Sequence, residues 1–220
     1  MGDVNLQLVR EFFELNVFRV LTNWQQDPGR LRLTESSAQL FVENTRPVPI
    51  PELPFALKAE DIGAIERAVV EVRAWHADRF YASVIESSPV LSQFVAEDSL
   101  ALAREVFNGA PFATILVVSE LPATLEHRNR SIGLLKKAGI GHIIEFPQIL
   151  HDLLDKVNIN GAYPGSETLQ TLRLLKRYKF VRNQQLEFLF TTEPPAASAP
   201  QADVAYQDAA EGPVEAGQGE

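Results

Sequence analysis

The chain has 220 residues, a hydrophobic content of 45% and no cysteine. This length suits one domain, or one domain with an appendage, and the apolar content is enough for a packed core. The absence of cysteine excludes disulfides, thiolate catalysis and any cysteine-based zinc site. The formal net charge of −9 is not the strongly basic balance that is typical of nucleic-acid binders.

The last part of the chain differs in composition from the rest. From Pro194 to Glu220 there are five acidic residues and no Lys or Arg, which leaves about −4 for the remainder. This segment is rich in Pro, Ala and Gly and cannot bury enough apolar surface to offset its ordering entropy. We therefore divide the chain into an α/β core (1–157), a helix–strand appendage (158–192) and a disordered acidic tail (193–220).

The sequence shows no signal for secretion or membrane insertion. The N-terminal stretch lacks a basic region followed by an uninterrupted apolar run. No apolar run approaches the roughly 20 residues that span a bilayer. We expect a cytoplasmic protein that does not associate with a membrane.

Helix and strand patterns alternate irregularly in the first half of the chain. Apolar residues at three- and four-residue steps predict a helix over 4–24, ended by the turn residues Asp27-Pro28-Gly29. Short strands are predicted at 30–34, 38–44 and 55–58, followed by a turn or brief helix at 61–66. The β-branched run at 68–75 predicts a longer strand.

The second half predicts a regular order of elements. For residues 78–95, which Pro89 interrupts, the sequence pattern predicts no particular secondary structure. Helices are predicted at 97–107, 124–138 and 148–157, and strands at 113–119 and 141–146, which implies parallel pairing of those strands. A helix at 166–178 and a strand at 185–190 follow. The fold class is α/β, with a mixed central sheet flanked by helices.

Two strand segments carry the residues that could perform chemistry. With a period of two, Glu71 and Arg73 share one face of their strand, and Gln39 and Glu43 share a face of theirs. The stretches Gln39-Leu40-Phe41-Val42 and Glu71-Val72-Arg73 resemble the motifs of the PD-(D/E)xK nuclease superfamily, which has the restriction-endonuclease-like fold. The order of elements over about 4–146 is also similar to that family.

The resemblance implies a metal-dependent catalytic site in which two of the family's motif residues are replaced. The family uses two carboxylates to hold Mg²⁺, and the metal and a lysine stabilise the charged transition state. Gln39 stands where the family has Asp, and Arg73 stands where it has Lys and cannot give up a proton. In one interpretation Glu71 retains a metal, Glu43 or Asp61 supplies a displaced carboxylate, and Arg73 stabilises the transition state. In the other, Glu71 and Arg73 form a cross-strand or same-face ion pair on a half-exposed sheet.

Other candidate residues carry less specific signals. The four histidines have no zinc-binding spacing, although His76 stands at a predicted strand end, where functional groups cluster. Ser119 follows a predicted strand but has no G-x-S-x-G around it. The sequence contains no glycine-rich phosphate-binding loop.

The predicted helix at 166–178 and the residues just after it are basic. Its cations are a candidate contact surface for phosphates or an acidic partner, or the solvated face of an amphipathic helix; they are Arg173, Lys176, Arg177, Lys179 and Arg182. We favour a non-catalytic interaction or scaffold protein on a degenerate restriction-endonuclease-like fold, with a protein partner and no cofactor. The alternative is a nuclease that depends on Mg²⁺ or Mn²⁺ and binds nucleic acid.

Overall fold

The computed structural model describes residues 3–22, 39–48, 50, 52–74, 76–77 and 79–181. The strands predicted at 30–34 and 185–190, Arg182 and the acidic tail lie outside these residues. The chain forms two units, Met1–Asn183 and Gln184–Glu220, and the description below concerns the first. Within the described ranges, no helix has the length and apolar content needed to cross a membrane.

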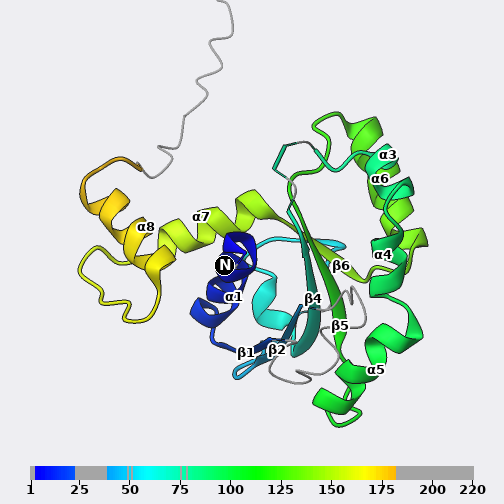
Figure 1. The fold of residues 1–220 in the computed structure, drawn as a ribbon, viewed down its shortest axis with the longest axis horizontal. Helices are drawn as coiled ribbons and strands as arrows, with labels where there is room; N and C mark the ends of the chain where they lie inside the picture. Colours follow the sequence, from blue (N-terminus) through cyan, green and yellow to red (C-terminus); the bar gives the residue numbers. More distant parts are fainter. Residues whose placement is uncertain are drawn as a thin grey trace, which may run out of the picture. The chain divides into compact units, whose positions relative to one another are not determined.

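The centre of the fold is a mixed sheet (Figure 1). Within the described residues its strands are β1 (Phe18–Thr22), β2 (Leu40–Asn44), β3 (Ala56–Leu57), β4 (Arg67–Arg73), β5 (Ala113–Val118) and β6 (His142–Glu145), in the order β1-β2-β4-β5-β6-β3. β2 is antiparallel to both of its neighbours, whereas β4, β5, β6 and β3 pair in parallel. The predicted combination of an antiparallel and a parallel portion is confirmed.

Helices cover both faces of the sheet (Figure 1). One face is covered by α1 (Val4–Leu15), η2 (Ile62–Ala64) and α7 (Phe146–Lys156), with α8 (Glu167–Arg177) packed outside α1 and α7; the other is covered by α3 (Ala82–Glu86), α4 (Pro89–Phe94), α5 (Glu97–Val106) and α6 (Leu125–Lys137). Alternate side chains of β4 enter the two layers: Val70 and Val72 join one apolar cluster, and Val69 joins the other. β4 is therefore buried on both faces.

The helix predicted over 4–24 is wrong in its second half, because the chain turns after Leu15 and returns as β1. Asn16 closes α1 by donating its side-chain Nδ2 to the Phe12 carbonyl at 2.8 Å. Val17 then adopts a left-handed φ of 62°, which reverses the chain. The apolar run after Val17 fits a period of two as well as a period of 3.6, so composition did not distinguish the strand from the helix.

The remaining helix and strand predictions need little correction. The elements predicted at 97–107, 113–119, 124–138, 141–146, 148–157 and 166–178 are present, with ends that differ by one or two residues. The segment 78–95, which the sequence left open, contains two short helices, and Pro89 stands in the first turn of the second.

Helix α8, which the sequence assigned to an appendage, packs into the same core as α1 and α7. Leu169 belongs to the apolar cluster that contains Phe12. The buried carboxylate of Glu11 on α1 accepts hydrogen bonds from Gln7 Nε2 at 2.8 Å, from Thr168 Oγ1 at 2.6 Å and from the Ser166 hydroxyl. Ser166 also caps α8 by accepting from the Leu169 amide. Polar and apolar contacts together hold α8 against α1.

Candidate functional site

The structure brings together the two stretches that resemble the nuclease motifs. Leu40 of β2 pairs with Val70 of β4, and the amide of Gln39 donates to the Val70 carbonyl at 3.0 Å. The side-chain oxygen of Gln39 accepts from the Val72 amide at 3.1 Å. The residue in the place of the family's Asp therefore lies beside the Glu71-Val72-Arg73 stretch. Its oxygen satisfies a backbone amide there.

Glu71 is completely buried, with 0% of its surface exposed. It lies on the face of β4 that α3–α6 cover, and its partner on β5 is Leu116 of the apolar cluster. Its carboxyl group contacts the guanidinium of Arg73 at 2.6 Å, without the alignment of a hydrogen bond. Burial in this apolar layer raises the pKa of Glu71 to about 8, although the positive charge of Arg73 opposes the rise.

The two carboxylates that could complete a metal site with Glu71 lie elsewhere. Glu43 is opposite Arg67 at the other end of β4 and forms an ion pair with it at 3.2 Å. Glu71 lies four residue steps along the strand from Arg67, which is about 13 Å. Asp61 follows β3, three strands away from β4, and accepts from the Lys58 amide at 2.8 Å. The structure does not place Glu43 or Asp61 beside Glu71.

The donors around Glu71 do not fit a divalent cation. Mg²⁺ and Mn²⁺ require several oxygen ligands, usually with two or more carboxylates near the ion. Among the described residues, no group of three or more His, Cys, Asp or Glu side chains is arranged to hold a metal. The cation next to Glu71 is instead the Arg73 guanidinium, at 2.6 Å.

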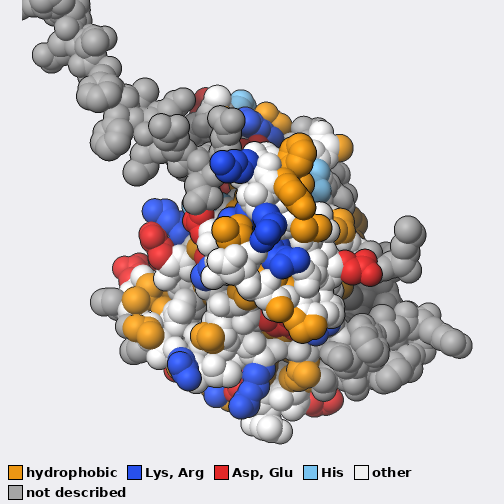
Figure 2. Space-filling view, turned by 90° about the vertical axis from the view of Figure 1, so that its left-hand side faces the viewer, with side chains coloured by type: hydrophobic (Ala, Val, Ile, Leu, Met, Phe, Trp, Pro, Cys, Tyr) orange, Lys and Arg blue, Asp and Glu red, His pale blue; other side chains and the backbone are white. Residues whose placement is uncertain are grey.

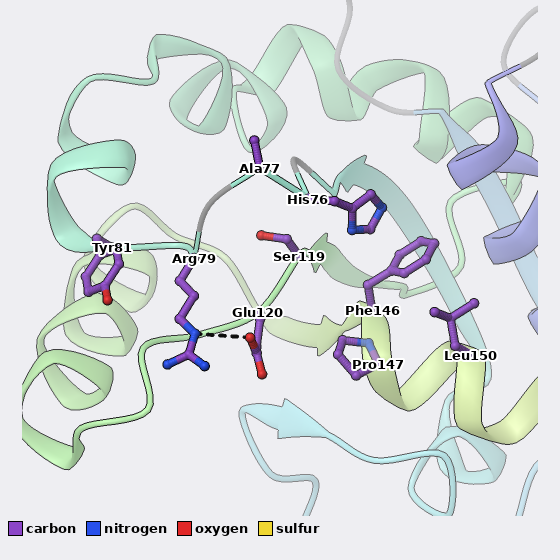
Figure 3. Close-up of a pocket in the computed structure, with 9 residues that line it drawn as sticks. All are labelled: His76, Ala77, Arg79, Tyr81, Ser119, Glu120, Phe146, Pro147 and Leu150. Atoms are coloured by element: carbon purple, nitrogen blue, oxygen red, sulfur yellow. Dashed lines mark hydrogen bonds and ion pairs between the residues drawn. The ribbon is translucent and has the colours of Figure 1, made fainter.

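A separate pocket of about 470 Å³ opens at the carboxyl ends of β4 and β5 and the start of α7 (Figure 3). Its lining residues come from three distant segments; they are His76, Ala77, Arg79, Tyr81, Ser119, Glu120, Phe146, Pro147 and Leu150. Small ligands commonly bind at this edge of a parallel sheet. The pocket is a candidate binding site, and its lining residues lie outside the two stretches that resemble the nuclease motifs.

The polar groups of this pocket are largely engaged with neighbours. Arg79 Nε donates to Glu120 at 3.1 Å, so the pocket contains a cation and an acid that compensate each other. The ring of His76 lies edge-on to Phe146 at 4.7 Å, and its Nε2 contacts Asn5 Oδ1 at 3.0 Å. The sequence indicated His76 and Ser119 individually, from their positions after strands. It gave no sign that the fold would place them at one pocket.

The cations predicted for a contact surface divide into two groups. Lys176 donates to the Leu154 carbonyl and, at 2.7 Å, to the Val157 carbonyl, so it caps the C-terminus of α7. Arg173 donates to the Gly161 carbonyl at 3.3 Å. Arg177 and Lys179 are exposed, and Arg182 lies outside the described residues. Two of the five predicted cations therefore have a structural role inside the unit.

Comparison of the chain with protein-family models, curated proteins and solved structures finds no match.

Proposed function

We propose that this protein is a non-catalytic interaction or scaffold module on a degenerate restriction-endonuclease-like fold. The observation that carries the proposal is the state of Glu71, the one acid retained from the motif, which is fully buried and paired with Arg73. A catalytic carboxylate must reach a metal and a substrate phosphate. A carboxylate sealed beneath α3–α6 reaches neither.

Chemistry at the other two motif positions supports the same proposal. Gln39 is neutral, and its oxygen is occupied by the Val72 amide. Arg73 retains a positive charge but cannot exchange a proton near neutral pH. The pairing of the two strands would then serve only to hold the sheet together, with the buried Glu71–Arg73 pair in place of a metal site.

An interaction module needs an accessible surface, and the outer end of α8 is the best candidate in the described part of the chain. Arg177 and Lys179 are exposed there, next to exposed apolar side chains. The partner under this proposal is a protein, since the surface offers few cations for tracking a phosphate backbone.

A cleavage assay tests the non-catalytic part of the proposal. Purified protein is incubated with plasmid, single-stranded DNA and RNA in Mg²⁺, in Mn²⁺ and in EDTA, alongside Glu71→Gln. We expect no cleavage above the EDTA background in any of these reactions. Metal-dependent cleavage by the wild type that the Glu71→Gln variant has lost would overturn the proposal and establish a nuclease with displaced ligands.

A further inference from the structure

A cluster of exposed side chains lies at the C-terminal end of α8 and consists of Leu174, Arg177, Tyr178, Lys179 and Phe180, which we call the α8 end patch. The exposed fraction is 44% for Leu174, 67% for Tyr178 and 80% for Phe180. Every other phenylalanine in the described ranges is buried or half-buried. A single exposed apolar residue is ordinary, but three that follow one another along a helix end indicate a contact surface.

The backbone holds this patch in a fixed arrangement. Lys179 has a left-handed φ of 61°, and its amide donates to the Lys176 carbonyl at 3.1 Å. The amide of Phe180 donates to the Leu175 carbonyl at 2.9 Å, which completes a Schellman motif. Lys176 also fastens this end of α8 to the end of α7. A surface ordered in advance loses little conformational freedom when a partner binds.

The charge of the patch is uncompensated within the described part of the chain. Neither Arg177 nor Lys179 forms an ion pair there, whereas Arg10, Arg67 and Arg128 each pair with a neighbouring acid. Figure 2, which looks onto the side that carries α8, shows Lys and Arg side chains interspersed with hydrophobic ones. Such a surface is complementary to a segment that carries both carboxylates and apolar side chains.

We propose that the α8 end patch binds an acidic peptide segment that also contains apolar residues, supplied by a partner protein. This inference rests on the proposed interaction function and names the chemistry of its partner. A peptide suits the patch better than a nucleic acid, because a strand-binding groove needs a continuous row of cations. Arg173 and Lys176, which would extend such a row, bind backbone carbonyls instead.

Selection from a random peptide library on the 220-residue chain tests this binding mode without assuming a partner. Peptides enriched on the wild type are synthesised and titrated by fluorescence anisotropy against wild type and Arg177→Glu/Phe180→Ser. Both substituted side chains are exposed, so the variant keeps its fold, which circular dichroism verifies. The matched control is Arg46→Glu/Val48→Ser, which makes the same kinds of change at exposed positions after β2.

We expect the enriched peptides to be rich in Asp and Glu and to contain apolar residues. Their affinity should fall about tenfold or more in the Arg177→Glu/Phe180→Ser variant, weaken in salt and stay unchanged in the control. Enrichment of peptides without excess acid, equal binding to the variant, or tighter patch-dependent binding of a labelled single-stranded oligonucleotide would each overturn the inference. The cleavage assay is independent of this result, so failure of the proposed function and failure of the peptide site are distinguishable.

Discussion

The free energy of unfolding of the wild-type protein is expected to fall steeply as the pH rises, and replacing Glu71 with Gln is expected to abolish this fall. Burial holds the pKa of Glu71 at about 8 in the folded protein, compared with an ordinary value of 4.5. Between these two values the folded protein keeps a proton that the unfolded chain releases. The free energy of unfolding therefore falls by about 1.4 kcal/mol for each pH unit in this window.

The sign and the limits of this effect follow from the two protonation states. Below pH 4.5 the carboxyl is protonated in both states, and its contribution to stability is fully present. It is lost as the pH rises through the folded value, and the loss reaches on the order of 4 kcal/mol near pH 8. A glutamine at this position has the shape of the neutral acid and cannot ionise, so the variant should not show this part of the pH dependence.

Urea unfolding of the wild type and Glu71→Gln, at several pH values across the window, measures the difference. Other ionisable groups contribute equally to both proteins, so the gap between the two curves reports Glu71 alone. Glu43→Gln is the matched control, because Glu43 lies on the neighbouring strand in a half-exposed pair with Arg67. Parallel curves for wild type and Glu71→Gln would show that Glu71 is not held neutral by burial.

Replacing Glu11 with Ala is expected to lower the free energy of unfolding by about 3 kcal/mol, because hydrogen bonds to a buried charged group are strong and their loss leaves donors unsatisfied. Glu11 is 1% exposed and accepts hydrogen bonds from Gln7, Ser166 and Thr168. The last two residues belong to the start of α8. The substitution should therefore loosen α8 more than the sheet.

Urea unfolding gives the overall loss, and amide hydrogen exchange shows where protection is lost. Glu14→Ala on the same helix is the control, since Glu14 forms a partly exposed pair with Arg10 at 2.7 Å that is worth at most about 1 kcal/mol. A loss no greater than that of Glu14→Ala, or unchanged exchange in α8, would mean that Glu11 does not hold the two helices together.

The helices and strands in the second half of the chain could be predicted because residues at their own ends mark where they begin and stop. Gly139 adopts a left-handed φ of 90° after α6, and Pro147 occupies the first turn of α7. Glycine and proline are the residue types that commonly mark these two positions of a helix. The end of α1 could not be predicted in the same way. It depends on a left-handed Val17, a conformation that β-branched residues rarely adopt, and on an asparagine that closes the helix.

At the candidate site, too, the sequence predicted the local arrangement of residues but not the contacts between distant segments. Period-two alternation correctly placed Glu71 and Arg73 on one face of β4. It did not indicate that four helices would bury this face, because an alternating V-E-V-R strand is typical of a half-exposed sheet. The distances of Glu43 and Asp61 from Glu71 depend on strand register and strand order, which a single sequence does not specify.

We infer that Glu71 belongs to a buried pair with Arg73 and not to a metal site. Titration of Mn²⁺, followed by the electron paramagnetic resonance signal of the free ion, tests it directly in the wild type and in Glu71→Gln. We expect the two proteins to bind Mn²⁺ equally weakly, with no stoichiometric site that depends on Glu71. One Mn²⁺ bound per chain by the wild type, and lost in Glu71→Gln, would contradict it.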